Sequence, residues 1–177
     1  MNAPQLTALV AGATGLVGVE VVRQLAAHPA VARTLALVRR QPAAGTFAPN
    51  VEVVTADFGA LEHEARRIAA THVVCALGTT MKQAGSRDAF QRVDHGYAVA
   101  LARGALAGGA RHFVLVSALG ADPDSHFFYN RVKGQAERDI LALGYRSVTI
   151  LRPSLLLGPR GEFRLGEAIA KRFAWLT

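Results

Sequence analysis

Residues 6–25, LTALVAGATGLVGVEVVRQL, constrain the fold more than any other stretch, because they predict a strand, a glycine turn and a helix in direct succession. Leu6–Ala11 is a short apolar run that contains branched residues. After Gly12 the apolar residues recur every four positions from Val17 to Leu25, which is helical spacing. We therefore expect a strand that turns directly into a helix.

The glycines of GATGLVG stand where that strand becomes a helix. Gly12 is expected to make the tight turn, Gly15 to let the backbone approach a pyrophosphate, and Gly18 to let the helix lie close to the strand. Unpaired amides of the first helical turn would then face the phosphates. The alternative is a tight strand–helix corner without a ligand. The predicted cofactor contacts here are Gly12, Thr14, Gly15, Leu16, Val17 and Gly18.

Length and composition predict one domain over residues 1–177, since 177 residues, 51% of them hydrophobic, suffice for a single core. The only cysteine, Cys75, excludes a disulfide framework and a cysteine zinc site and fits a reducing cytosol. No stretch has the length of about 20 apolar residues that spans a bilayer. We expect a cytoplasmic protein with no metal and no membrane partner.

The net charge of +7 does not by itself indicate a nucleic-acid partner, because the basic residues are scattered in ones and twos. A solvated basic surface is the preferred interpretation, with some charges available for an anionic cofactor. The expected partner is a small-molecule substrate.

Arg39 and Arg40 end the second predicted strand, about 20 residues beyond Gly18. NAD sites usually place a carboxylate there for the ribose hydroxyls, whereas a basic residue favours a 2′-phosphate. The sequence therefore predicts NADP(H) as the preferred cofactor, with NAD(H) as the other candidate. Arg39 is the first choice for the phosphate contact and Arg40 the second; the alternative is an arginine pair in a solvated turn.

Two further strand ends are predicted to line the cofactor crevice. After the third strand, Asp57 is expected to accept from the adenine amino group and Phe58 to pack beside the ring, although Asp57 as a helix cap is an alternative. After the fourth strand, Leu77, Gly78, Thr79 and Thr80 are predicted to contact the cofactor through close backbone approach and the threonine hydroxyls.

Strand and helix patterns alternate along the whole chain, which predicts an α/β fold with a doubly wound parallel sheet of the Rossmann type. After the first strand and helix, the expected strands are 34–38, 51–55, 71–77, 114–117 and 147–151, and the expected helices are 61–70, 86–106, 127–143 and 166–175. The helices 86–106 and 127–143 offer a two-fold contact, so both monomer and homodimer are open.

Ser117, Tyr129 and Lys133 form the predicted reactive group. Ser117 closes a strand, and Tyr129 and Lys133 are four residues apart on a helix, so they share one face. An ammonium beside a phenol favours the phenolate. Tyr129 is expected to exchange a proton with a carbonyl or alcohol during hydride transfer, with Ser117 holding the substrate oxygen. A Tyr-x-x-x-Lys pair on a solvated surface is the alternative interpretation.

At this point the sequence resembles the short-chain dehydrogenase/reductase superfamily, in its extended or atypical branch, and within it the Tat-interacting oxidoreductase-like family. The resemblance spans the chain and is carried by five segments: GATGLVG, CALGTTMKQAGS, VDHGYAVALA, HFVLVSALGADPDSHFFYNRVKGQAE and LRPSLLLGPRGEFRLGE. It implies an NADP-binding fold with the three reactive residues above, in which Lys133 also holds the nicotinamide ribose. It also implies that Arg152, Pro153 and Ser154 lie beside the nicotinamide, with an ion pair to a loop carboxylate as the alternative for Arg152.

The chain departs from this family at Asp94, near where many relatives have an asparagine that supports a proton relay. It also stops at Thr177, whereas relatives usually continue through a segment that closes the substrate pocket; here residues after about 152 are expected to contribute to that pocket. Two other functions stay open. One is a nucleotide-sugar epimerase or dehydratase, and the other is an NADPH-sensing protein that binds a protein partner and turns nothing over.

Overall fold

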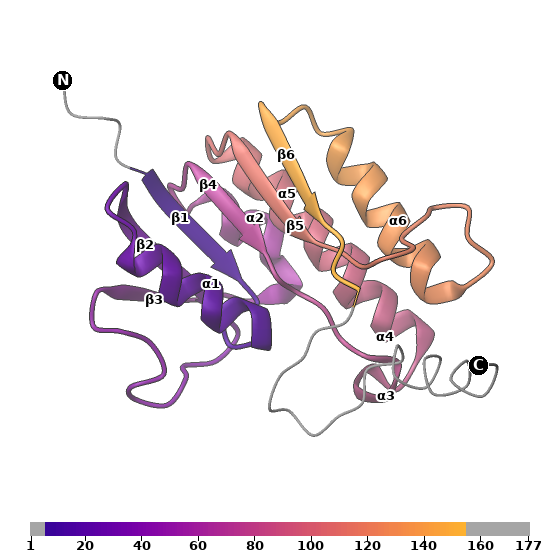
Figure 1. Cartoon of the computed structure of the whole chain (residues 1–177), viewed down its shortest axis with the longest axis horizontal. Helices are drawn as coiled ribbons and strands as arrows, with labels where there is room; N and C mark the ends of the chain where they lie inside the picture. The colour runs from indigo at the N-terminus through magenta and orange to yellow at the C-terminus, as the bar shows by residue number, and fades with distance from the viewer. Residues whose placement is uncertain (1–5, 155–177) are drawn as a thin grey trace, which may run out of the picture.

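The computed structural model describes residues 6–154, which form one six-stranded parallel sheet with helices on both faces (Figure 1). The strand order is β3-β2-β1-β4-β5-β6. The strands are β1 (Leu6–Ala11), β2 (Val31–Val38), β3 (Val51–Thr55), β4 (His72–Cys75), β5 (His112–Val116) and β6 (Ser147–Leu151). The predicted doubly wound Rossmann-type fold is confirmed.

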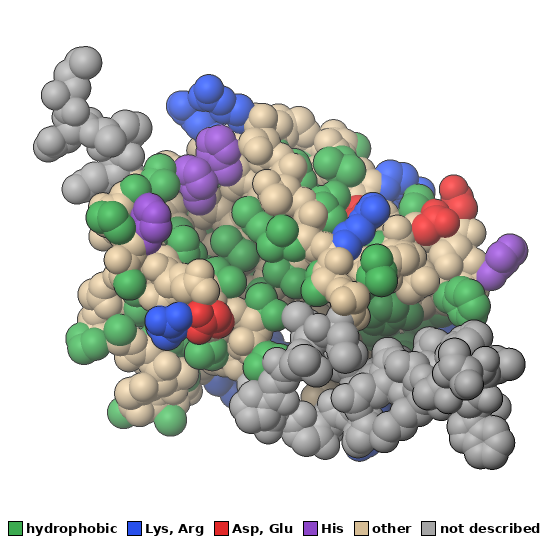
Figure 2. All heavy atoms as spheres, viewed as in Figure 1, with side chains coloured by type: hydrophobic (Ala, Val, Ile, Leu, Met, Phe, Trp, Pro, Cys, Tyr) green, Lys and Arg blue, Asp and Glu red, His purple; other side chains and the backbone are tan. Residues whose placement is uncertain are grey.

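The helices bury two separate apolar clusters against the sheet. On one face α1 (Leu16–Ala27) places Val22 against Val10 of β1 and Ala36 of β2. On the other face lie α2 (Leu61–Arg66), α5 (Ala98–Ala107) and α6 (Phe128–Leu141). Figure 1 shows α1 in front of the sheet and α2 and α5 behind it. Hydrophobic side chains also gather over the middle of the front face (Figure 2). No helix among the described residues has the length and apolar character needed to cross a bilayer.

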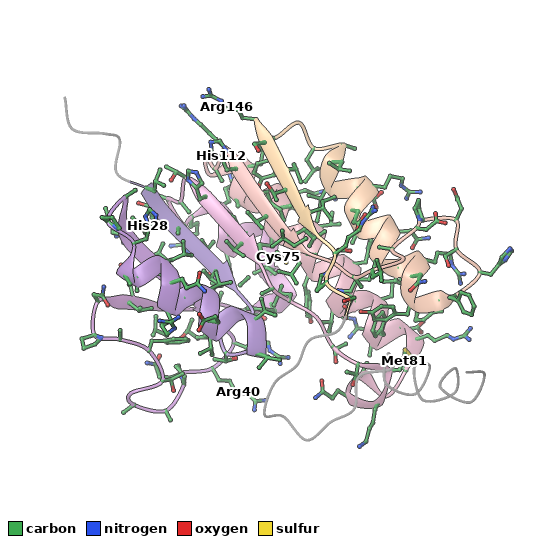
Figure 3. The ribbon with its side chains drawn as sticks, viewed as in Figure 1. His28, Arg40, Cys75, Met81, His112 and Arg146 are labelled. Carbon is green, nitrogen blue, oxygen red and sulfur yellow. The ribbon has the colours of Figure 1, made fainter. Side chains whose placement is uncertain are left out.

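The sheet brings the carboxyl ends of its strands to one edge. In the register, Ala11 of β1 pairs with Leu37 of β2 on one side and with Cys75 of β4 on the other. Because β2 and β3 lie on one side of β1 and β4 to β6 on the other, the strand order reverses between β1 and β4. Open α/β sheets bind their ligands at such a point. Arg40 and Met81 lie at this lower edge of the view, whereas His112 and Arg146 lie at the opposite edge (Figure 3).

The predicted unbroken helix 86–106 is wrong in one respect, because it contains a π-helical segment. Ser86 begins α4 (Arg87–Gln91), and its hydroxyl accepts a hydrogen bond from the Ala89 amide, as a cap should. A π-helix over Arg92–Tyr97 follows before α5. In this part of the helix Asp94 and Ala98 are buried, whereas Val93 and Tyr97 are half-buried. A carboxylate thus points into the interior.

Other boundaries differ from expectation by a few residues. The predicted helix 61–70 is a 3-10 turn over Phe58–Ala60 followed by the short α2, and the fourth strand ends two residues early, at Cys75. The second strand starts three residues earlier than predicted, at Val31. A further short helix, α3 (Met81–Ala84), precedes α4. The predicted helix 166–175 lies outside the described residues.

Candidate functional site

The glycine turn between β1 and α1 has the shape of a phosphate cradle. Gly12 has a φ of +77°, and a Cβ there would lie 2.5 Å from the Ala76 carbonyl oxygen. At Gly18 a Cβ would lie 2.0 Å from the Gly12 carbonyl oxygen, so α1 reaches this position only without a side chain. Gly15 precedes α1 and has no side-chain cap. The first amides of α1 are therefore available to an anion.

Substituting Gly18 by alanine should disturb this cradle directly. The new methyl would overlap the Gly12 carbonyl, and we expect a loss of about 1–3 kcal/mol in the free energy of unfolding together with weaker dinucleotide binding. Gly96→Ala is the matched control, since a Cβ there has its nearest neighbour 3.9 Å away. Urea denaturation and nucleotide titration of both variants check this; equal behaviour of the two would contradict it.

A cleft of about 660 Å³ opens beside the ends of β2 and β3. Arg39 and Arg40 line it together with Phe58, and the guanidinium carbon of Arg39 lies 5.9 Å from the centre of the Phe58 ring. Both arginine side chains are exposed. The cleft thus combines two cations with an aromatic wall.

The sequence-based description of this cleft was incomplete. Asp57 caps the 3-10 turn, because its carboxylate accepts a hydrogen bond of 2.8 Å from the Gly59 amide, as the alternative interpretation expected. Tyr97 was missed: its ring meets Phe58 edge to face, with the centroids 5.6 Å apart. Glu64 also lines the cleft. Tyr97 lies at the end of the π-helix and is half-buried against the core.

A buried ion pair lies at the carboxyl end of β4. The Lys133 Nζ is 2.7 Å from Asp94 Oδ1, and both side chains are almost fully buried. The other Asp94 oxygen accepts a hydrogen bond of 2.9 Å from the Thr79 amide. Burial by itself lowers the pKa of Lys133, but the Asp94 carboxylate and then Tyr129 outweigh it and raise that pKa. Lys133 is therefore a charged ammonium at neutral pH.

Tyr129 and Ser117 lie at the same edge as this ion pair. Tyr129 is half-buried one turn before Lys133 on α6, with its ring 5.6 Å from that of Phe90. Ser117 directly follows β5, and its amide donates to Leu151. The Ser117 hydroxyl is buried and has no hydrogen-bond partner among the described residues. A hydroxyl in that state is a candidate for contact with a ligand, because a buried polar group without a hydrogen bond costs about 1–3 kcal/mol.

The segment after β4 runs directly over the ion pair. A Cβ at Gly78 would lie 3.3 Å from Asp94 Oδ1, which is tighter than normal packing. The Thr79 amide is held by Asp94, and the Thr80 hydroxyl accepts from the Gln83 amide as the cap of α3. Leu77 is half-buried against the core. The backbone here is thus fixed by protein contacts, and the Thr80 hydroxyl already has a structural role.

Arg152 pairs with a helix carboxylate, not with the loop carboxylate that the alternative interpretation named. The Arg152 Nε donates to Glu137 Oε1 at 3.1 Å, and the Arg152 Nη2 donates to Glu137 Oε2. Glu137 is buried and was missed, although it stands four residues after Lys133 and therefore on the same face of α6. Pro153 accepts from the Leu119 amide, and Ser154 is exposed.

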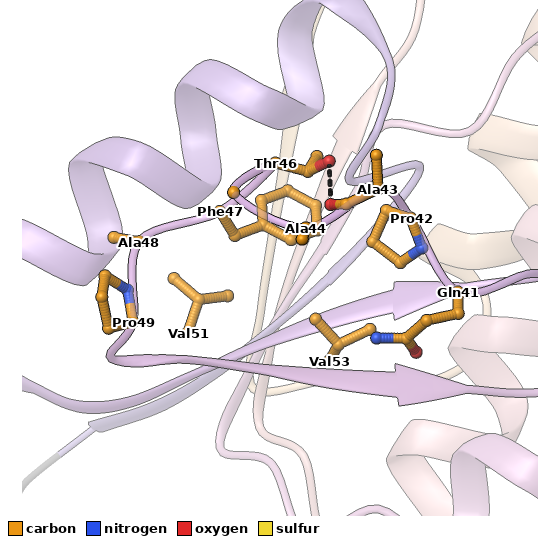
Figure 4. A pocket seen from close by; sticks show the side chains of 11 residues that line it. Gln41, Pro42, Ala43, Ala44, Thr46, Phe47, Ala48, Pro49, Val51 and Val53 are labelled. Atoms are coloured by element: carbon orange, nitrogen blue, oxygen red, sulfur yellow. Dashed lines mark hydrogen bonds between the residues drawn. The ribbon is translucent and has the colours of Figure 1, made fainter.

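A separate pocket of about 230 Å³ lies under the loop between β2 and β3 (Figure 4). Phe47 and Pro42 line it with Val51 and Val53, and Thr46 stabilises the loop by donating to the Ala43 carbonyl at 2.7 Å. Its walls carry no charged side chain, so it does not resemble the cofactor crevice. Within residues 6–154 no cluster of three or more His, Cys, Asp or Glu side chains is arranged to hold a metal ion.

The fold and the glycine cradle are those of a dinucleotide-binding protein, and comparison with known proteins identifies the family. Residues 12–170 match the family model described as NAD(P)H-binding, and the chain belongs to this family. It is also 38% identical over 168 residues to "Protein fmp52, mitochondrial" of Emericella nidulans, an alignment that covers 92% of this chain and 72% of the relative.

Solved structures agree on the fold. A UDP-glucose 4-epimerase from Thermotoga maritima, solved with UDP-glucose, superposes with a TM-score of 0.72 at 16% identity, covering 89% of this chain and 58% of that one. The Bordetella bronchiseptica enzyme WbmG, solved with NAD and UDP, has a TM-score of 0.72 at 17% identity, covering 99% and 62%. This chain spans less than two thirds of either structure.

The expectation of a cytoplasmic protein is contradicted by these relatives. The proteins of Emericella nidulans and Aspergillus fumigatus, each 38% identical to this chain, are named mitochondrial. The expectation rested on a single cysteine and on the lack of a long apolar stretch, and neither feature distinguishes one reducing compartment from another. The comparisons leave the Tat-interacting assignment as a prediction.

Proposed function

We propose that this protein is an NADP-dependent oxidoreductase that transfers hydride to or from a small carbonyl or alcohol. The observation that carries the proposal is the buried Lys133 side chain, which pairs with Asp94 at 2.7 Å and stands four residues after Tyr129, on the same face of α6. The pair lies at the carboxyl edge of the sheet, where the glycine cradle opens. The Tat-interacting oxidoreductase-like assignment is compatible with this chemistry and is part of the proposal.

The residues present fit a dinucleotide. The amides at the start of α1 would hold the pyrophosphate, Arg39 and Arg40 the 2′-phosphate, and Asp57 and Phe58 the adenine. A nicotinamide cofactor supplies the hydride when bound. Lys133 has three N–H donors and uses one toward Asp94, so it retains donors for ribose hydroxyls.

The chain itself supplies the proton chemistry. In the reducing direction the Tyr129 hydroxyl would protonate the oxygen of the carbonyl substrate, and in the oxidising direction it would remove the proton of the alcohol. Lys133 stabilises the phenolate that results. The Ser117 hydroxyl is expected to donate to the same substrate oxygen, which would satisfy a group that the described residues leave without a partner.

The cofactor part of the proposal can be tested by titrating the protein with NADPH and NADH and following nicotinamide fluorescence. We expect NADPH to bind more tightly, and Arg39→Ala to weaken it about 10- to 100-fold while changing NADH binding little, because hydrogen bonds to charged groups contribute about 1.5–3 kcal/mol. Arg33→Ala is the matched control, since Arg33 is an exposed arginine near the other end of β2 and pairs with Glu52. Equal affinities for the two nucleotides would contradict the 2′-phosphate role.

A nucleotide-sugar epimerase is the second candidate, because structural neighbours were solved with UDP-glucose or with NAD and UDP. The absence of a carboxylate at the end of β2 argues against tight NAD binding of the kind such a cycle needs. The same titration separates the two functions: a clear preference for NADH would favour the epimerase.

A further inference from the structure

Asp94 is a buried carboxylate that pairs directly with Lys133. It is 2% exposed and sits in the π-helix Arg92–Tyr97, whose wider turn points it into the protein. Both of its oxygens have partners: Oδ1 contacts the Lys133 Nζ at 2.7 Å, and Oδ2 accepts from the Thr79 amide at 2.9 Å. The next residue, His95, contacts Asp139 of α6 at 2.8 Å. The π-helix is thus joined to α6 at two successive positions.

The charges around Lys133 can be counted from the elements packed against it. Asp94 faces it from the π-helix, Tyr129 from its own helix α6, and Cys75 from the end of β4. Burial raises the pKa of Cys75 to about 11, so its thiol is neutral in the physiological range. The Asp94 carboxylate, 2.7 Å from the Lys133 nitrogen, is therefore the charge that compensates the ammonium.

We infer that Asp94 is a positioning residue of this site. It fixes the Lys133 nitrogen and, by compensating the charge of the ammonium, sets the pH at which Tyr129 exchanges its proton. The catalytic consequence rests on the proposed function. In the wild type, a phenolate at Tyr129 forms beside an ammonium whose charge the Asp94 carboxylate partly offsets. Without the carboxylate it would form beside an uncompensated ammonium, and ionisation would be easier.

The test is an ultraviolet titration of tyrosinate in the protein without nucleotide or substrate. The Tyr129 signal is isolated by subtracting the curve of the same protein carrying Tyr129→Phe, which leaves Tyr97 and Tyr145 in both samples. Asp94→Asn keeps an oxygen for the Thr79 amide and removes only the charge. We expect it to lower the midpoint of the Tyr129 signal by about one pH unit or more, the size of effect that a nearby charge exerts.

The double variant Asp94→Asn/Lys133→Met provides the decisive comparison. It removes both members of the ion pair, so the protein should fold even if Asp94→Asn alone does not. Its Tyr129 midpoint should lie above that of Asp94→Asn, because the uncompensated ammonium that eases ionisation is gone. A midpoint that stays low without Lys133, or that does not move in Asp94→Asn, overturns the inference.

Activity provides a second readout that separates this inference from the proposed function. With a substrate in hand, the pH dependence of kcat/KM for alcohol oxidation should shift to lower pH in Asp94→Asn by the same amount as the tyrosinate midpoint. If the midpoints shift as expected but no variant or wild type turns over any carbonyl or alcohol, the proposed function fails while the electrostatic role of Asp94 stands.

Discussion

Replacing Tyr129 by phenylalanine is expected to reduce turnover by about 10²–10⁴-fold, the usual contribution of a positioned general acid or base. The change removes only the hydroxyl and keeps the ring, which packs 5.6 Å from Phe90. NADPH binding should therefore be unchanged, because Lys133, the glycine cradle and Arg39 are untouched. The measurement is NADPH consumption with a panel of aldehydes and ketones, alongside a nucleotide titration.

Tyr97→Phe is the matched control for that experiment. Tyr97 lines the cleft beside Arg39 and is remote in the sequence from the proposed proton donor. Its substitution also removes one phenolic hydroxyl, and we expect kcat to remain near the wild-type value. Similar losses in both variants would mean that the Tyr129 hydroxyl has no special role.

The same pair of variants also separates enzyme from sensor. A protein that only senses NADPH needs Lys133 and the cradle for binding but has no use for the Tyr129 hydroxyl. If wild type and Tyr129→Phe bind NADPH equally and neither turns over any member of the panel, while the cellular effect survives the substitution, the interaction-protein function is favoured over the oxidoreductase.

Much of the fold could be predicted because apolar periodicity and turn residues agree along the chain. The bounds of β1, β3 and β6 are those expected from short branched runs. The glycine turn was recognisable because its three glycines have separate steric reasons, two of which are close approaches to backbone within 2.5 Å. Local signals of this kind do not depend on the rest of the protein.

The inner part of the site could not be predicted in the same way. A π-helical turn has no propensity signal of its own, so Asp94 was expected only as a departure from a family pattern. Its burial depends on α6, which arrives about 40 residues later in the chain and brings Lys133 to within 2.7 Å. Glu137 is different. The sequence shows its helical spacing from Lys133, but it does not show that Arg152 is its partner.

Substituting Lys133 by methionine should cost about 3–5 kcal/mol of the free energy of unfolding, because it leaves a buried carboxylate without its counter-charge. The side chain of Asp94 is 1% exposed, so water cannot replace the lost ammonium. Methionine fills a similar volume, which keeps the loss of packing small. The measurement is urea denaturation near neutral pH, where Asp94→Asn/Lys133→Met should recover most of the stability.

The pH dependence of the free energy of unfolding is a second test of the ion pair between Lys133 and Asp94. The pKa of Lys133 is raised in the folded protein, chiefly by Asp94 acting against burial. The stabilisation it supplies is therefore fully present below the unfolded lysine value of about 10.4 and is lost as pH rises through the higher folded pKa. Wild type should lose stability above about pH 10.4 more steeply than Lys133→Met. Parallel curves for the two proteins would show that the ion pair does not stabilise the fold, and Lys133 would then act at the site through its position alone.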